Sequence, residues 1–226
     1  MWLGGSMAMP GGVSIRRLLL LLSVVVLGWG VGQIVGRLRP AGSDVGDRPA
    51  AQAAVGDRTA PRVEVAAPTL TLVVFTDYLC PACRATDPAM AAAIARDGHV
   101  RTVYRDFPIF GPVAENAARV AIAADRQGIY AALHRRLMAE RRPLDDAVLR
   151  EAVETVGGNW ASLERDRRVH AAAIEAQLVI TREQAAAIGI TGTPSYLAGP
   201  ILAVGGRDEA GFAKLFADGR AAAARE

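Results

Sequence analysis

Residues 69–95 place a run of apolar and β-branched residues directly before a helix-forming stretch, with the chain's two cysteines at the junction. The run TLTLVVFT, at 69–76, is typical of a buried strand. Pro81 stands where the first residue of a helix tolerates proline. A buried strand that leads at once into a helix predicts an α/β fold, with Cys80 and Cys83 at the helix amino terminus.

The downstream pattern alternates between further strands and a long helical region. Short strands are expected at 62–65, 100–105, 195–197 and 201–204. Helices are expected from Pro112 to about Glu140, from Asp145 or Asp146 to Gly157, over 160–188 as one or two helices, and over 208–223.

The amino-terminal part of the chain contains an uncharged apolar stretch. Residues 18–36 read LLLLLSVVVLGWGVGQIVG, which is long enough as a helix to span the apolar core of a bilayer. A secretory signal that is later cleaved is the alternative, but no small-x-small cleavage motif follows it. We expect a short segment at 1–17 and a single-pass anchor at 18–36.

Residues 37–65 are rich in Ala, Gly, Pro, Asp and Arg and show little hydrophobic periodicity. This composition predicts a flexible tether, followed by a folded domain over 66–226. The anchor and tether together predict a membrane-attached protein whose domain lies outside the cytoplasm, which in a bacterium is the periplasm or another extracytoplasmic space. If the signal is cleaved, the domain is secreted instead. Basic residues are scattered among acids, which argues against nucleic-acid binding.

Two cysteines with two residues between them are compatible with several kinds of site. A structural zinc site needs four ligands, and the chain has no third cysteine and no paired histidine motif. Covalent haem attachment requires a histidine after the second cysteine, where Arg84 stands. A structural disulfide would close a loop too short to stabilise the fold much. We therefore expect no metal and no cofactor other than a redox-active Cys80–Cys83 disulfide.

The redox interpretation has a physical mechanism. The unsatisfied N–H groups and the dipole at a helix amino terminus favour a thiolate at Cys80. Cys80 is therefore predicted to be the attacking and more exposed sulfur, and Cys83, one turn further on, to resolve the mixed disulfide. Pro81 and Ala82 shape the loop between them, and Ala82 adds neither charge nor hydrogen bond.

A second motif, GITGTPSYLAG, lies near the other end of the domain at 189–199. Pro194 begins a predicted strand, where proline cannot donate a ladder hydrogen bond. A cis Thr193–Pro194 bond in a tight turn is one explanation, and an ordinary trans proline at a strand start is the other.

Three segments, FTDYLCPAC, YRDFPIFGP and AIGITGTPSYLAG, in this order and spacing, make the chain resemble the DsbA-like thiol–disulfide oxidoreductases. The resemblance covers roughly residues 69–216. It implies a thioredoxin fold with a helical subdomain inserted at about 112–189. It also implies that Cys80 is the nucleophile, that Cys83 resolves, that Pro194 is cis, and that the backbone of Thr193 receives the substrate peptide as an added strand.

The sequence leaves the direction of electron flow open, because Pro81-Ala82 is not the best-known dipeptide of the oxidising members. The preferred hypothesis is an oxidase that forms disulfides in exported proteins and is recycled by a redox partner. The alternatives are a reductase or isomerase of the same fold, or a membrane-tethered module that binds peptides or copper.

Other polar residues near these motifs carry weaker predictions. Asp77 either tunes the cysteines or ends the strand before them. His134 lies beside Arg135 and Arg136, which predicts a solvated helix face and no catalytic role.

Overall fold

The computed structural model describes residues 19–29 and 41–225. The chain divides into two units, residues 1–40 and 41–226. In the first unit, residues 19–29 form a helix whose side chains are exposed. No helix within the described residues combines the length and apolar character needed to cross a membrane. The predicted segment 1–17, and residues 18 and 30–36 of the predicted anchor, lie outside the described residues.

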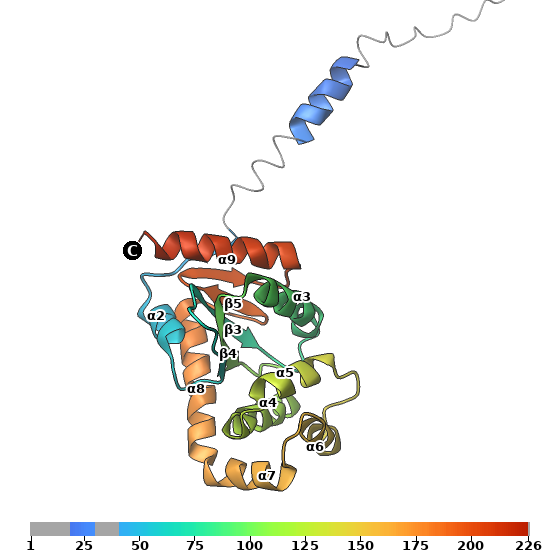
Figure 1. Cartoon of the computed structure of the whole chain (residues 1–226), viewed down its shortest axis with the longest axis vertical. Coiled ribbons are helices and arrows are strands. Elements are labelled where there is room, and N and C mark those ends of the chain that lie inside the picture. Colours follow the sequence, from blue (N-terminus) through green and yellow to red (C-terminus); the bar gives the residue numbers. More distant parts are fainter. Residues whose placement is uncertain (1–18, 30–40, 226) are drawn as a thin grey trace, which may run out of the picture. The chain divides into compact units, whose positions relative to one another are not determined.

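The second unit is built around a mixed sheet of six strands in the order β1-β6-β5-β3-β4-β2 (Figure 1). The central strands β3 and β4 are parallel, and every other neighbouring pair is antiparallel. The strands are β1 (Ser43–Asp44), β2 (Arg62–Val63), β3 (Leu70–Thr76), β4 (Val100–Asp106), β5 (Ser195–Ala198) and β6 (Ile201–Val204).

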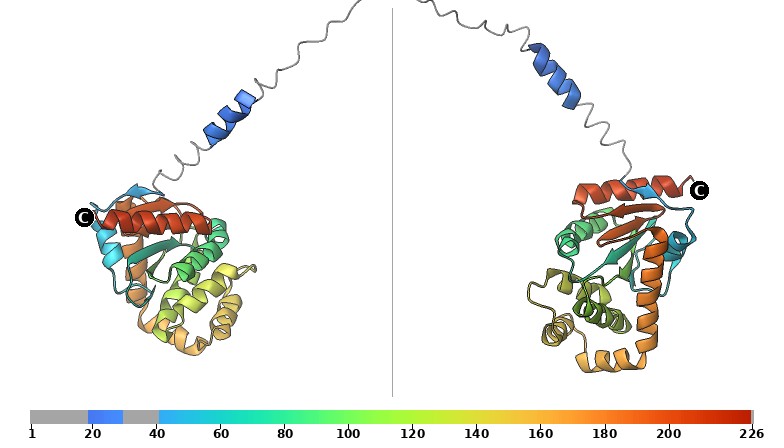
Figure 2. Two further views of the ribbon diagram at one scale, coloured as in Figure 1. Left: turned by 45° about the horizontal axis from the view of Figure 1, so that its top comes forward. Right: turned by 180° about the vertical axis from the view of Figure 1, so that it is seen from behind.

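Helices cover both faces of this sheet and form a separate group beyond it. The helices are α2 (Pro49–Gly56), α3 (Pro81–Asp97), α4 (Pro112–Ala124), α5 (Tyr130–Ala139), α6 (Asp146–Thr155), α7 (Trp160–Val169), α8 (Ala171–Ile188) and α9 (Glu209–Ala223). Figure 2 shows α3 and α9 on one side of the sheet and α2 with α8 on the other. The α4–α7 group extends below the sheet in Figure 1, as expected for the insertion predicted at 112–189.

The alternation of side chains along β3 explains why the sheet is covered on both faces. Leu72 and Val74 belong to the larger apolar core, which also contains residues of α3, α5 and α9. Val73 and Phe75 point the other way, into a smaller core with residues of α2 and α8. Because successive side chains of a strand point to opposite faces, a strand with apolar side chains on both faces must be covered on both.

The segment predicted as a flexible tether, 37–65, is folded over its described part. Residues 41–65 carry β1, α2 and β2, and α2 packs Ala51 and Ala54 against the smaller core. The fully buried Arg105 of β4 also forms an ion pair with Asp57, Nη2 to Oδ2 2.5 Å. The prediction was wrong here because alanine, which has no large apolar side chain, packs a helix closely without producing a strong hydrophobic pattern. The compact unit therefore begins near residue 41 rather than 66.

The other predicted elements agree with the structure except in one place. The helix expected from Pro112 to about Glu140 is divided by a 3₁₀ turn at Asp125–Gln127. Gly128 follows with a φ of 69°, a left-handed conformation that glycine adopts at little cost and that ends the turn. The short edge strand expected at 62–65 is present as β2, paired with β4.

Candidate active site

The two cysteines lie where β3 ends and α3 begins. The Asp77 carbonyl accepts a hydrogen bond from the amide of Cys80 at 3.1 Å, which turns the chain out of the strand. Cys80 is the N-cap of α3, and its sulfur accepts a hydrogen bond from the amide of Cys83 at 3.4 Å. This amide is one of the helix donors that lack an intrahelical partner, so the amino terminus of α3 directs a backbone N–H at the Cys80 sulfur.

Both thiols are free and both are buried, with 3% of each residue exposed. The prediction that Cys80 would be the more exposed sulfur is therefore wrong in this structure. Pro81 and Ala82, between the cysteines, are the exposed residues of the motif. Burial raises the pKa of the Cys83 thiol to about 12, so this thiol is protonated at neutral pH.

The loop before β5 covers Cys80. The Thr193–Pro194 bond is cis, and the Cys80 thiol lies 3.3 Å from the Thr193 carbonyl oxygen, to which it donates. The loop is held by two further hydrogen bonds, from Ser195 Oγ to Gly192 O at 2.8 Å and from the Gly205 amide to Pro194 O at 2.9 Å. The structure thus brings the predicted residues Thr193 and Pro194 to the cysteine pair.

A buried polar cluster lies beside the site, and the sequence interpretation missed it. His134 is only 1% exposed, so its assignment to a solvated helix face was wrong. Its Nδ1 is 3.3 Å from the Tyr78 hydroxyl, and its Nε2 is 3.1 Å from Asp87 Oδ1. The helical spacing of Tyr130, Leu133, His134 and Leu137 was the available signal, because residues three, four and seven apart share one helix face.

Asp106, which is also buried, is the last member of this hydrogen-bonded cluster. Both of its carboxylate oxygens accept from the Tyr130 hydroxyl, at 3.0 and 3.1 Å, and Tyr78 donates to Tyr130 at 3.4 Å. Burial raises the pKa of Asp106 to about 7, against the opposing effect of the Tyr130 and Tyr78 hydrogen bonds. Burial also raises the pKa values of both tyrosines well above the ordinary value.

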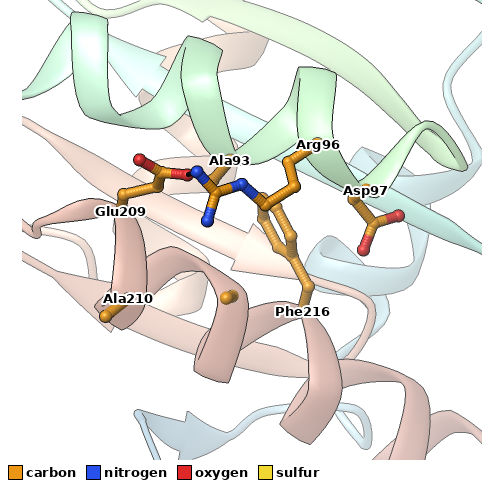
Figure 3. Close-up of a pocket in the computed structure, with 7 residues that line it drawn as sticks. Ala93, Arg96, Asp97, Glu209, Ala210 and Phe216 are labelled. Carbon is orange, nitrogen blue, oxygen red and sulfur yellow. Dashed lines mark ion pairs between the residues drawn. The ribbon is translucent and has the colours of Figure 1, made fainter.

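Two other features of the described residues lie apart from the site or add nothing to it. Within 19–29 and 41–225, no group of three or more His, Cys, Asp or Glu side chains is placed to hold a metal ion. A hollow of about 380 Å³ lies between α3 and α9 (Figure 3), beside the Arg96–Glu209 ion pair. Arg96 lies near the carboxyl end of α3, whereas the cysteines occupy its amino end, so this hollow is separate from the thiols.

Comparison with known proteins agrees with this geometry. Residues 71–217 match the model of the DSBA-like thioredoxin domain. The chain is similar to a thioredoxin-like oxidoreductase from Silicibacter pomeroyi, with 29% identity and a TM-score of 0.70 over 77% of this chain and 98% of that one. It is also similar to a periplasmic thioredoxin-like protein from Salmonella enterica serovar Typhimurium, with 27% identity and a TM-score of 0.67 over 76% and 97% of the two chains.

Two further matches support smaller conclusions, one about the fold and one about a short part of a longer protein. The thiol-disulfide exchange protein alpha-DsbA2 from Wolbachia pipientis shares the fold, with 24% identity and a TM-score of 0.69 over 74% of this chain and 90% of that one. The curated Na(+)/H(+) antiporter NhaA 3 of Salinispora tropica is 36% identical over 81 residues, which are 34% of this chain and only 12% of the antiporter. From the match over 71–217 and the buried thiol pair at the strand–helix junction, the chain belongs to the DSBA-like thioredoxin domain family and is a thiol–disulfide oxidoreductase.

Proposed function

We propose that this protein oxidises the thiols of exported proteins through Cys80 and Cys83. The observation that carries the proposal is the environment of the Cys80 sulfur. It lies at the amino terminus of α3, accepts the Cys83 amide, and contacts the Thr193 carbonyl. The Cys83 amide points at the sulfur on which negative charge develops when a mixed disulfide at Cys80 is broken, and a reduced form stabilised by such a donor makes the disulfide form a stronger oxidant.

The reaction follows from the two different environments of the sulfurs. A substrate thiolate attacks the Cys80 sulfur of the Cys80–Cys83 disulfide, a mixed disulfide forms, and the electron pair of the broken bond goes to Cys83. That sulfur takes up a proton, since burial raises the pKa of Cys83 to about 12. A second substrate thiolate then attacks the substrate sulfur of the mixed disulfide and releases Cys80 as a thiolate. Two electrons pass from the substrate dithiol to the protein, and a redox partner must remove them.

The loop at Thr193–Pro194 supplies the place for the substrate chain. In the proposed complex, an extended substrate segment pairs with the backbone of Thr193 and presents its cysteine to Cys80. In the oxidised protein Cys80 carries no thiol proton, so the Thr193 carbonyl, which accepts from Cys80 in the reduced form, is left to pair with the substrate backbone.

The proposed place of action is outside the cytoplasm. The apolar stretch at 18–36 supports this, and so does the similarity to a periplasmic protein of Salmonella. Disulfides persist in such oxidising compartments, where a protein that forms them has substrates. In this proposal residues 18–36 attach the protein to the membrane.

The test is a trapping experiment in cells that carry Cys83→Ser. Without the resolving sulfur, Cys80 is expected to remain linked to its substrates as mixed disulfides, which appear on non-reducing gels and disappear with reductant. Cys80→Ser is the matched control and should trap nothing. If Cys83→Ser forms no adduct with any exported protein, disulfide exchange is not its function.

The direction of electron flow needs a separate measurement. The full-length chain is equilibrated with glutathione buffers of graded ratio, and the reduced fraction of the Cys80–Cys83 pair is measured. An easily reduced disulfide supports the oxidase, whereas a disulfide that resists reduction makes the protein a reductase or isomerase.

A further inference from the structure

Arg84, the residue after Cys83, connects the segment before Cys80 to the inserted helices. Its Nε donates to the Tyr78 carbonyl at 2.6 Å, and its Nη1 donates to the Glu140 carbonyl at 2.8 Å. Tyr78 lies two residues before Cys80, and Glu140 is the C-cap of α5. One guanidinium therefore holds the backbone that leads to the thiols against a helix 56 positions further along the chain.

Both ends of this connection are firmly held. The amide of Arg84 also donates to the Cys80 carbonyl at 3.2 Å, so Arg84 holds this segment through its main chain as well as its side chain. At the other end, Glu140 is 5% exposed. Its carboxylate accepts from the Arg142 amide at 2.9 Å and from the Arg142 Nε at 3.0 Å. The end of α5 is thus a fixed point to which the guanidinium is attached.

The surroundings of the Arg84 guanidinium are unfavourable for stability alone. Among the residues that the structure describes, its hydrogen bonds go to two carbonyl oxygens and to no carboxylate, and its Nη2 is buried without a partner. A buried donor that has lost water and gained no acceptor is destabilising. An apolar side chain of similar volume would avoid this penalty. What it would not supply is two donors in fixed directions for two carbonyls.

From this geometry we propose that Arg84 is a positioning residue for the thiol pair. By holding the Tyr78 carbonyl at the end of α5, it keeps the Cys80 sulfur in place for two contacts, from the Cys83 amide at 3.4 Å and to the Thr193 carbonyl at 3.3 Å. Both contacts favour the reduced form, because a disulfide sulfur has no proton to donate and is a weak acceptor. The inference rests on the proposed exchange at Cys80 and holds for either direction of electron flow.

The experiment measures the equilibrium constant for reduction of the full-length chain by glutathione. In this reaction the Cys80–Cys83 disulfide and two glutathione molecules give the protein dithiol and one glutathione disulfide. The constant compares two folded forms, so a loss of stability that both share leaves it unchanged. Arg84→Met should lower the constant about fivefold, the effect of about one hydrogen bond, because the reduced form loses its well-placed contacts.

A second variant separates the placement of the donors from the effect of the charge. Arg84→Lys keeps the positive charge but replaces the planar fork with one ammonium group, which cannot hold both carbonyls in the same directions. The equilibrium constant should fall in Arg84→Lys as it does in Arg84→Met. If Arg84→Lys keeps the wild-type constant while Arg84→Met does not, the charge is responsible and the positioning role is wrong.

Arg101→Met is the matched control. Arg101 is half-buried like Arg84, and it also donates to a backbone carbonyl, that of Val55, at 3.1 Å. It lies opposite Thr71, near the start of β3, whereas the thiols follow the end of that strand. The control should stay within about twofold of the wild-type constant. If it falls as far as Arg84→Met does, the loss of any half-buried arginine has this effect and the proposal is wrong.

Glu140→Gln tests the connection from its other end, without a change in α3 or in the segment before Cys80. The variant removes the charge on which the Arg142 donors converge and so loosens the carbonyl that Arg84 holds. The equilibrium constant should fall about twofold, in the same direction as in Arg84→Met. If Arg84→Met fails to fold and Glu140→Gln keeps the wild-type constant, the proposal is refuted.

The remaining outcomes distinguish this inference from the proposed function. A constant that is unchanged or higher in both Arg84 variants refutes the positioning role and leaves disulfide exchange intact. A wild-type chain that does not exchange with glutathione at any ratio refutes the proposed function, and the positioning role with it.

Discussion

Asp106→Asn is expected to stabilise the protein at neutral and alkaline pH. Asp106 is buried at the end of β4, and burial, supported by the nearby charges of Asp77 and Asp125, raises its pKa from 3.8 to about 7. The native state therefore holds a proton that the unfolded chain releases. Below pH about 4 both states are protonated, and above pH about 7 the native state carries a buried charge that the unfolded chain keeps in water.

The magnitude follows from linkage. One pKa unit corresponds to about 1.4 kcal/mol, so the increase from 3.8 to about 7 amounts to about 4 kcal/mol. This contribution is fully present below pH about 4 and is lost as the pH rises through about 7. Asparagine has no proton to release and keeps one oxygen for the Tyr130 hydroxyl, so the variant should avoid most of the loss.

The assay is urea unfolding of the wild-type and variant chains at pH 4.5 and pH 8. The free energy of unfolding of the variant, relative to wild type, should rise between these two values by about 2 to 4 kcal/mol. Asp47→Asn, at an exposed position, is the control and should show no such rise. If the difference for Asp106→Asn does not change with pH, or if the variant is less stable at pH 8, then the ionised carboxylate stabilises the native state and the reasoning is wrong.

Two other predictions concern stability and thiol reactivity. Asp57→Ala leaves the guanidinium of Arg105, which is 2% exposed, without its partner. The free energy of unfolding, measured in urea, should fall by about 3 to 5 kcal/mol. A fall below about 0.5 kcal/mol would show that residues 41–65 contribute little to the fold. In Cys80→Ser, Cys83 should react with iodoacetamide at pH 8 at least about 100-fold more slowly than glutathione, because its pKa is raised to about 12. Mass spectrometry follows the alkylation, and a rate close to that of glutathione would contradict the burial of this thiol.

The buried cluster at Asp106, Tyr130 and His134 connects the two parts of the domain. Asp106 belongs to the sheet, whereas Tyr130 and His134 belong to α5 of the inserted helices. Tyr78, which contacts both, lies two residues before Cys80. The position of the cysteine loop therefore depends on the helical insertion as well as on the sheet.

The sequence alone was enough to predict the local framework of the site. The apolar run of β3, the cysteine pair, the helix that Pro81 opens, and the Thr193–Pro194 turn were each visible as short patterns. Such signals are local, because strand alternation and helix capping involve residues only a few positions apart. The same kind of signal predicted a helix cap at Asp145 or Asp146, and the structure has Asp145, whose side chain accepts from the Val148 amide.

Only the tertiary structure decided what surrounds the thiols. The contact of Cys80 with Thr193 joins residues 113 positions apart, and the bonds from Ile109 and Phe110 to Asp77 span 32 and 33 positions. The same folding buried Cys80 as deeply as Cys83, although its position at a helix start had predicted that it would be the more exposed of the two. Burial and long-range hydrogen bonds depend on which elements the chain topology brings together, and no short pattern in the sequence records that arrangement.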